Sequence, residues 1–592
     1  MLVATLVIFL GAAFFRTQIV RNNDYTLRAD ENRMRATPIP APRGTIVDRN
    51  GQLIAETTIS YALHLQPTSI ESARGGLLLM QPNIGFSATQ VEAFLELLRM
   101  KPDEPVLISH SLSFDQLSWL QENRTELPAF QLEAIPQRHY PEGEAIAHLV
   151  GHVAEISAAE LADTVTWPGY RRGQIVGKAG IERRYETLLG GVLGERYVEV
   201  DARGRVVGDL APRESRAPVA GGAIRISLDV ELQRFIHEIF PKDHNGAVVA
   251  LVPSTGEVLA LYSYPTYDPN QLNGGVDKAL WAQLNRDPRR PLLNRAISGI
   301  YPPGSTWKLA TAIVGLETGV ITEDSRMPQA CSGGMNYAGR YWRCWNRDGH
   351  GDVDLAGAIA NSCNVYFYQL GIRIGLNQLA KEGTRLGFAR KTGIDLPSEK
   401  AGAFPSGSDW YREWFGRAAT PSEVMSLAIG QGPNSQTPLR MAQFFAALAG
   451  TGQAPAPRLV GSAEADPPET DLGLRPKTIE ALRRGLARVL EPGGTAYMSS
   501  LSRWTVYGKT GTSQTSEDPE RPHAWFAGFA GAPGEAPEIA FSVVVEFGES
   551  GSGTAAPLGA KVADFYLNRK HGYETERLQT LGERTTGRAV GE

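Results

Sequence analysis

The chain has few cysteines and no excess of basic residues. Among its 592 residues, 59 are Lys or Arg and 64 are Asp or Glu, which gives a net charge of -5. Because the chain has no excess of Lys and Arg residues to bind phosphates, we expect no nucleic acid partner. The three cysteines are an odd number, so any disulfide scheme within the chain leaves one of them unpaired.

Long hydrophobic runs are also scarce. The uncharged stretch 2–15 is shorter than the ~20 apolar residues of a spanning helix, and Arg16 interrupts it before Ile19. No Lys or Arg precedes the stretch, although a cleaved signal peptide normally begins with basic residues. A membrane anchor, a cleaved signal and a buried helix all stay open here. No other segment is apolar enough to span a bilayer, which excludes a polytopic polymerase.

Ser305-Thr306-Trp307-Lys308 is the only S-x-x-K motif in the chain, and it opens an apolar run at 309–316. On a helix this spacing places Ser305 and Lys308 on one face, one turn apart. An amine at that position can take the proton of the hydroxyl group. A single S-x-x-K also fits an ordinary helix N-cap, so other motifs must decide its meaning.

Two further motifs follow in order. Ser362-Cys363-Asn364 is the only S-x-N, and it separates two apolar stretches, which predicts a break between two helices. K-T-G occurs twice, beginning at Lys391 and at Lys509. The first copy leads into Pro397, which argues against a central strand.

The second K-T-G follows a strand-like run at 504–508 and precedes two more, at 524–529 and 539–545. These runs predict an antiparallel sheet, and we take Lys509 as the active-site lysine. We interpret His523 as strand packing rather than as a base, because the lysine and serine already supply proton transfer. The runs 245–252 and 256–261 predict a hairpin in the same sheet.

The ordered S-x-x-K, S-x-N and K-T-G triple resembles the penicilloyl-serine transferase superfamily. The segment 43–51 is similar to the R-G-x-I-x-D-R-x-G signature of class B penicillin-binding proteins. Segments 429–432, 493–496 and 523–526 are also similar to that class. The resemblance covers nearly the whole chain and is closest to the penicillin-binding protein 2 branch, the elongation D,D-transpeptidases.

This resemblance implies a multidomain α+β fold. It comprises an N-terminal membrane anchor, a mixed α/β pedestal and head, and a C-terminal penicilloyl-serine transferase (β-lactamase-like) domain with an antiparallel sheet and a helical subdomain. We expect an uncleaved anchor at 1–20 whose cytoplasmic end is missing, and a non-catalytic pedestal of dimerisation type at 21–220 with a head insertion at about 61–172. The transpeptidase domain then spans 221–568, and 569–592 form a polar tail. We interpret the 43–51 signature as a structural turn and domain contact.

The resemblance also assigns roles. It makes Ser305 the nucleophile, Lys308 its base, and Ser362 a proton relay to the leaving amine, while Asn364 holds the substrate amide and Lys308. Burial and the charge of Lys509 are both expected to lower the pKa of Lys308.

Lys509 supplies positive charge for Ser362 and the terminal carboxylate of the donor, and Thr510, Gly511 and Thr512 bind substrate. The backbone N–H groups of Ser305 and Thr512 are the expected oxyanion hole.

The implied function is cross-linking of peptidoglycan stem peptides ending in D-Ala-D-Ala during cell elongation, through an acyl-serine intermediate that β-lactams trap. The implied location is the inner membrane, single-pass, with the catalytic domain in the periplasm. The implied partners are a SEDS-family rod-shape glycosyltransferase and the elongation scaffold. A β-lactamase or β-lactam sensor of the same fold, and a scaffold that activates a membrane glycosyltransferase, are the alternatives.

All three cysteines lie close together in the catalytic region, as Cys331, Cys344 and Cys363, and His350 falls among them. Three thiolates and an imidazole make a closed tetrahedral zinc set, and some penicillin-binding protein 2 homologues hold a zinc near this place. We expect a structural zinc and no cofactor requirement for catalysis. A Cys331–Cys344 disulfide and unlinked thiols are the alternatives, as is a zinc set in which an aspartate replaces one ligand: Asp348, Asp352 or Asp354.

Overall fold

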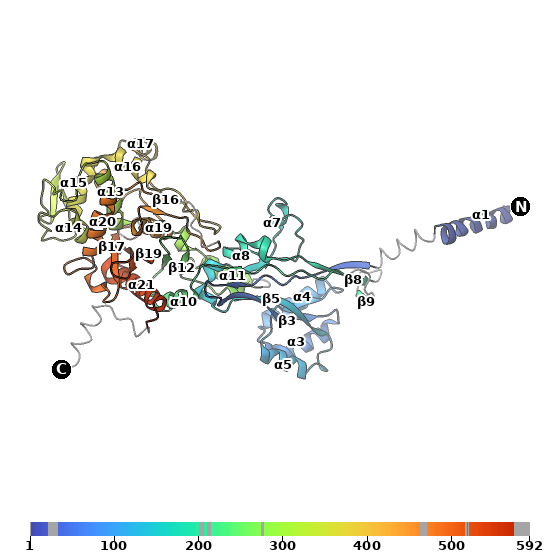
Figure 1. Cartoon of the computed structure of the whole chain (residues 1–592). Helices are drawn as coiled ribbons and strands as arrows, with labels where there is room; N and C mark the ends of the chain where they lie inside the picture. Colours follow the sequence, from blue (N-terminus) through green and yellow to red (C-terminus); the bar gives the residue numbers. More distant parts are fainter. Residues whose placement is uncertain are drawn as a thin grey trace, which may run out of the picture.

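The structure is a computed structural model of the whole chain, shown in Figure 1. It describes residues 2–21, 34–200, 206–209, 215–273, 278–461, 470–515, 518 and 520–573. A small lobe and a narrow sheet region lie on one side of a larger globular domain formed by the second half of the chain (Figure 1).

The N-terminal apolar stretch forms helix α1 (Leu2–Phe15), followed by the π-helical turn η1 (Arg16–Val20). Large apolar side chains along α1 are exposed, with Ile8 and Phe9 about three-quarters accessible. Within the residues described, no helix combines the length and apolar character needed to cross a bilayer.

Besides the two-stranded sheet of β6 (Val153–Glu155) and β7 (Ile175–Gly177), the described part of the pedestal and head contains two larger sheets. One has the order β1-β8-β9, from strands Met34–Ile39, Gly194–Val200 and Val206–Asp209. The other has the order β10-β2-β3-β4, from Ile224–Arg225, Ile46–Val47, Leu53–Leu65 and Val106–Ser109, and β5 (Phe130–His139) also pairs with β3. The long strand β3 therefore runs from the pedestal into the head.

The 43–51 signature is the structural turn and domain contact that the sequence indicated. Buried Arg43 pairs with Glu182 at 2.7 Å and Glu186 at 2.8 Å inside the pedestal. Asp48 accepts a hydrogen bond from the backbone N–H of Val230, which begins helix α10 (Val230–Ile239) of the next domain. The signature thus ties the pedestal to the catalytic domain.

The head has its own apolar core. Helices α3 (Ile70–Ile84), α4 (Ala88–Met100) and α5 (Phe114–Glu122) pack on β3, β4 and β5 around buried residues from Leu63 to Leu127. Ser87 and Ser113 form capping boxes at the starts of α4 and α5, which satisfy free N–H groups there. Tyr140 and Ile146, further along the expected insertion, belong to the main core instead.

The catalytic domain is built on one five-stranded antiparallel sheet with the order β12-β11-β19-β18-β17. The predicted hairpin is β11 and β12, and the three predicted late strands complete the sheet, so both ends of the domain close it. The strands are β11 (Gly246–Leu251), β12 (Val258–Tyr264), β17 (Thr505–Ser513), β18 (His523–Gly531) and β19 (Ile539–Val545).

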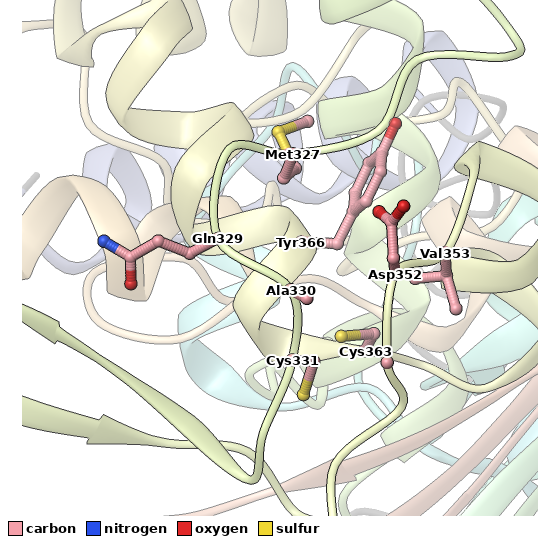
Figure 2. A pocket seen from close by; sticks show the side chains of 9 residues that line it. Met327, Gln329, Ala330, Cys331, Asp352, Val353, Cys363 and Tyr366 are labelled. Atoms are coloured by element: carbon pink, nitrogen blue, oxygen red, sulfur yellow. The ribbon is translucent and has the colours of Figure 1, made fainter.

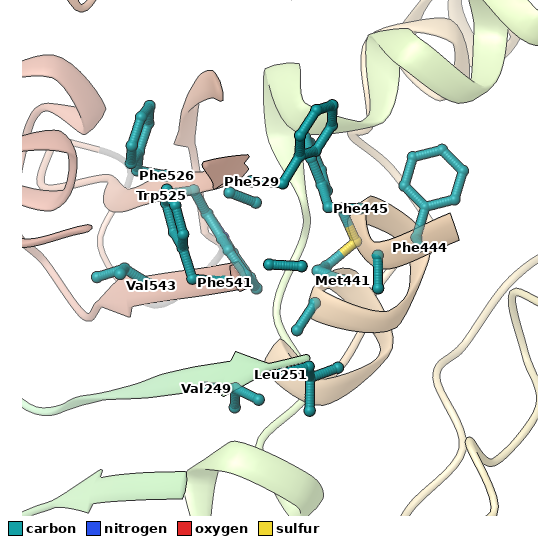
Figure 3. Close-up of a cluster of buried hydrophobic side chains, with 14 of the residues drawn as sticks. Val249, Leu251, Met441, Phe444, Phe445, Trp525, Phe526, Phe529, Phe541 and Val543 are labelled. Carbon is teal, nitrogen blue, oxygen red and sulfur yellow. The ribbon is translucent and has the colours of Figure 1, made fainter. Parts of the chain in front are cut away.

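Every residue of β11, β18 and β19 is buried, because helices cover both faces of the sheet. Helix α19 (Pro438–Ala449) is buried along its whole length, and its two buried polar side chains are paired, since Arg440 donates to Gln443 at 2.7 Å. Figure 3 shows Met441 and Phe445 of α19 beside Phe529 and Phe541 of the sheet. This layer fixes the strands that present the K-T-G motif.

Helices α10 and α21 (Ala556–Lys570) pack on the other side, in contact with β12, β18 and β19. Helix α21 reaches Lys570, so Arg569 is helical and pairs with Asp229 at 2.9 Å, and the polar tail does not begin at residue 569. Residues 574–592 of that predicted tail lie outside the described residues.

The helical subdomain faces strand β17. It contains α13 (Lys308–Glu317), α14 (Leu355–Ala360), α15 (Asn364–Ile374), α16 (Leu376–Arg385), α18 (Pro421–Ala428) and α20 (Pro476–Arg488). The S-x-N motif falls in the break between α14 and α15, as the sequence predicted. The three motifs therefore meet where this subdomain contacts the sheet.

Candidate active site

The nucleophile candidate Ser305 lies in the 3-10 turn η4 (Gly304–Trp307), and Lys308 begins α13 directly after it. The turn is held from behind, because the Gly304 N–H donates to the Gly430 carbonyl at 3.0 Å. Gly430 has φ of 76°, and a Cβ there would meet the Gly304 carbonyl oxygen. Gly430 therefore acts as a close-fitting support for the serine turn.

The S-x-N turn surrounds the amine of Lys308. Its Nζ donates to the Ser362 carbonyl at 2.8 Å, lies 3.1 Å from Ser362 Oγ and donates to Asn364 Oδ1 at 2.7 Å. Ser362 has φ of 52°, a left-handed conformation that costs a non-glycine residue roughly 1–2 kcal/mol. That conformation is stabilised here because it turns both the carbonyl and the hydroxyl toward Lys308.

Burial lowers the pKa of Lys308 to about 8, against the opposing influence of Cys344 and Cys363. The side chain is fully buried, so its charged form loses the solvation it has in water. Lys509 was expected to add to this effect. The coupling between two like charges is reciprocal, and it is seen here on Lys509, whose pKa is lowered well below its ordinary value, first by burial and then by the charge of Lys308.

Strand β17 brings the second K-T-G to the serine turn. A Cβ on Gly511 would lie 3.0 Å from the Pro303 carbonyl oxygen and 3.1 Å from Thr306, so the glycine permits close contact between strand and turn. Lys509 Nζ donates to the Thr510 carbonyl at 3.0 Å. The selected motif therefore lies next to the S-x-x-K motif.

The first K-T-G is a structural loop. Thr392 donates through its backbone N–H and hydroxyl to Glu399, and Arg440 donates to the Lys391 carbonyl at 2.6 Å. The same loop carries Asp395, which accepts a hydrogen bond from the pedestal residue Tyr185 at 2.6 Å. This copy serves the contact between the domains.

Thr510 and Thr512 have different surroundings. Thr510 Oγ1 lies 2.9 Å from Thr495 Oγ1, whereas Thr512 is exposed and its Oγ1 accepts from the Gly551 N–H at 3.4 Å. Thr495 was not singled out from the sequence. The Gly-Gly-Thr-Ala segment that contains it was the available signal, and it shows its contact with K-T-G only in the fold.

A second network supports the serine turn from the sheet side. Tyr301 donates to Glu546 at 2.7 Å, and Glu546 pairs with Arg295 at 2.8 Å. His523 packs edge-to-face on Tyr301, and its Nδ1 accepts from the Phe547 N–H at 3.0 Å, in line with a packing role. Neither Glu546 nor Arg295 belongs to a recognisable motif, so no pattern in the sequence pointed to them.

The predicted metal cluster is assembled by the fold. One ligand atom from each of Cys331, Cys344, His350 and Cys363 lies within 4.8 Å of the others, and all three thiols are free of disulfides. His350 Nδ1 lies 3.6 Å from the Cys331 sulfur and 3.5 Å from the Cys344 sulfur. Backbone hydrogen bonds between Cys331 and Gly351 hold the two loops together.

The electrostatics of the cluster favour a cation. Hydrogen bonds from Cys363 and then His350 lower the pKa of the Cys344 thiol, whereas the pKa of Cys363 is raised, because its S–H donates a hydrogen bond to the Cys344 thiolate. A buried thiolate beside two more sulfurs and an imidazole suits zinc by donor chemistry. Two of the alternative ligands have other partners: Asp352 pairs with Arg326, and Asp354 accepts from the Gly357 N–H.

A small cavity of about 10 Å³ adjoins this cluster, lined in part by Cys331, Cys363, Asp352 and Tyr366. In Figure 2, the Cys331 and Cys363 side chains lie at one end of the lining, with the Tyr366 ring and Met327 toward the other. Cys363 is also the middle residue of S-x-N. The cluster and the catalytic turn thus share a residue.

A buried amine held by an S-x-N turn, beside a serine turn and a K-T-G strand, defines a serine acyl-transfer enzyme. The profile of the penicillin-binding protein transpeptidase domain matches residues 246–564, and that of the penicillin-binding protein dimerisation domain matches 38–225. This chain belongs to the penicillin-binding protein transpeptidase family.

Similar proteins agree with this family. The peptidoglycan D,D-transpeptidase MrdA of Haemophilus influenzae is 32% identical, over 96% of this chain and 92% of that protein. A penicillin-binding protein (PBP2) of Helicobacter pylori, solved in complex with MreC, has a TM-score of 0.77 and 29% identity, over 91% of this chain and 100% of that one. PBP2 of Pseudomonas aeruginosa, in complex with WCK 5153, has a TM-score of 0.68 and 32% identity, over 92% of this chain and 100% of that one.

Proposed function

We propose that this chain is a peptidoglycan D,D-transpeptidase that cross-links stem peptides during cell elongation and is a target of β-lactams. The observation that carries the proposal is the buried Lys308 amine, bound to Ser362 and Asn364 at the start of the helix that directly follows the turn of Ser305. Relatives named as D,D-transpeptidases support the reaction class.

In the proposed mechanism, neutral Lys308 takes the proton of Ser305 Oγ as that oxygen attacks the carbonyl carbon between the two D-alanines. The peptide bond breaks, and the proton passes through Ser362 to the departing amine of D-alanine. An amine of a second stem peptide then attacks the ester, and its proton returns by way of Lys308 to Ser305.

Backbone N–H groups would stabilise the negative charge that develops on the substrate carbonyl oxygen. The N–H groups of Ser305 and Thr512 would bind the oxyanion, and Lys509, Thr510 and Gly511 would bind the carboxylate end of the donor on strand β17. Asn364 holds both Lys308 and the substrate amide.

The test is covalent labelling by a fluorescent penicillin. Stable label on the wild-type chain that is lost in Ser305→Ala would support the acyl-serine mechanism. Rapid loss of the label would instead favour a β-lactamase, and no label on a folded chain would favour a scaffold. The long pedestal and head, for which a β-lactamase has no need, favour the transpeptidase.

We also propose a structural zinc held by Cys331, Cys344, His350 and Cys363. A zinc ion with four protein ligands has no open position for water, so it would brace the loop that contains Cys363 and leave the reaction to Ser305 and Lys308. Metal analysis of the purified chain should give about one zinc per chain.

His350→Gln should lower the metal content and the unfolding temperature. His139→Gln, at an exposed histidine of β5, is the matched control and should change neither. Protein without metal that contains a disulfide by mass spectrometry would contradict the zinc proposal.

The membrane assignment is likewise a proposal, supported by the exposed apolar side chains of α1. It places the chain in the inner membrane with its catalytic domain in the periplasm.

A chain in a peptidoglycan synthase complex that coordinates polymerization and crosslinking has 28% identity and a TM-score of 0.71, over 98% of each chain, and the Helicobacter pylori relative binds MreC. These relatives support partners in polymerization and an MreC-type partner, and we propose a SEDS-family glycosyltransferase and the elongation scaffold for these places. Membrane fractionation and co-purification would test both.

A further inference from the structure

One aromatic side chain connects the metal cluster to the S-x-N turn. Trp345 directly follows Cys344, and its indole N–H donates to the carbonyl of Asn361 at 3.0 Å. Its ring also lies 5.3 Å from that of His350. Asn361 immediately precedes Ser362, the proposed proton relay, so the indole acts on the peptide group that leads into the relay.

The turn is held at two successive carbonyls. Trp345 binds the carbonyl of Asn361, and Lys308 binds the carbonyl of Ser362. The peptide between them is the one that enters the left-handed conformation of Ser362. The N–H of Ser362 already donates to the Ile359 carbonyl at 3.2 Å, so the indole of Trp345 holds the same peptide group at its other end. A peptide group held at both its N–H and its carbonyl restricts the direction of Ser362 Oγ.

The exposure of Trp345 argues against a purely packing role. Its side chain is 57% exposed, in contrast to Trp307 and Trp525, which are almost fully buried. An indole that buries so little area contributes little to the core. Its directed contact is the N–H donor at Asn361.

We propose that Trp345 is a positioning residue for the transpeptidation reaction, which keeps Ser362 aligned with Lys308 by anchoring the Asn361 carbonyl. The inference rests on the proposed function, because it assigns Ser362 a part in acyl transfer. It predicts a loss in the rate of acylation rather than in ligand affinity.

The experiment separates the binding constant from the first-order acylation constant, using a chromogenic β-lactam and the full chain. Trp345→Phe keeps an aromatic ring and removes the donor. We expect the acylation constant to fall about three- to tenfold, as for loss of one hydrogen bond. The binding constant, zinc content and unfolding temperature should stay unchanged. Trp414→Phe, at an exposed tryptophan of α17 (Ser408–Phe415), is the matched control and should acylate normally.

A second pair of variants tests the donor itself. Gln at position 345 retains an N–H donor and Leu does not, so Trp345→Gln should acylate faster than Trp345→Leu. Equal rates for this pair, or normal acylation by Trp345→Phe, would overturn the inference. A loss of rate that follows a loss of zinc would also overturn it, in favour of a structural role. If the wild-type chain itself is not acylated, the proposed function fails instead.

Discussion

The pH dependence of acylation follows from the environment of Lys308. Its pKa is lowered from 10.5 to about 8, mainly because the amine is fully buried. The amine is a base only when neutral, and the neutral fraction rises as pH rises toward the pKa. At pH 7 a group of pKa 8 is about one-tenth neutral, roughly 300-fold more than at pKa 10.5.

The acylation rate constant should therefore rise about tenfold between pH 6 and pH 7, reach half its limit near pH 8 and level off above about pH 9. The assay is the rate of labelling by a fluorescent penicillin from pH 6 to 9.5, at constant ionic strength. Lys308→Arg is the companion variant, because a guanidinium stays protonated throughout this range, and labelling should fall at least ~100-fold. A flat wild-type profile, or a rise that continues unchanged to pH 9.5, would refute the assignment of Lys308 as the base.

Three further predictions concern the framework. Gly430→Ala should slow acylation at least ~10-fold, because its Cβ would push on the Gly304 carbonyl, which displaces the turn of Ser305. Gly432→Ala is its control, since Gly432 also has positive φ but its Cβ would meet no atom closer than 3.9 Å; equal rates for the two variants would contradict the support role. Arg43→Leu should lower the free energy of unfolding in urea by about 3–5 kcal/mol, because it leaves the carboxylates of Glu182 and Glu186 buried with less positive charge beside them. A decrease of less than about 1 kcal/mol would show that the network does not stabilise the fold. Tyr185→Phe should lower stability by about 1 kcal/mol through loss of the hydrogen bond to Asp395 and leave acylation unchanged, so slowed labelling would instead indicate that this contact reaches the active site.

The sequence by itself predicted the chemistry of the site and much of its framework. The single S-x-x-K and S-x-N each begin or interrupt an apolar helical stretch, so Ser305, Lys308 and Ser362 are recognisable without a fold. The strand-like runs around Lys509 identified the sheet, because alternation and strand length are local properties of the chain. The cysteines and His350 were found by the same means, through residue type and nearness in sequence.

Tertiary structure decided the contacts between segments that are distant in the chain. The left-handed Ser362, its hydrogen bonds with Lys308 and the hydrogen bond from Trp345 depend on three chain segments that meet only in the folded structure. The strength of the coupling between Lys308 and Lys509 also depends on the fold, because each pKa depends on burial and on every neighbouring charge. Local patterns specify which groups are present, whereas distance and desolvation, which set their reactivity, exist only in the folded chain.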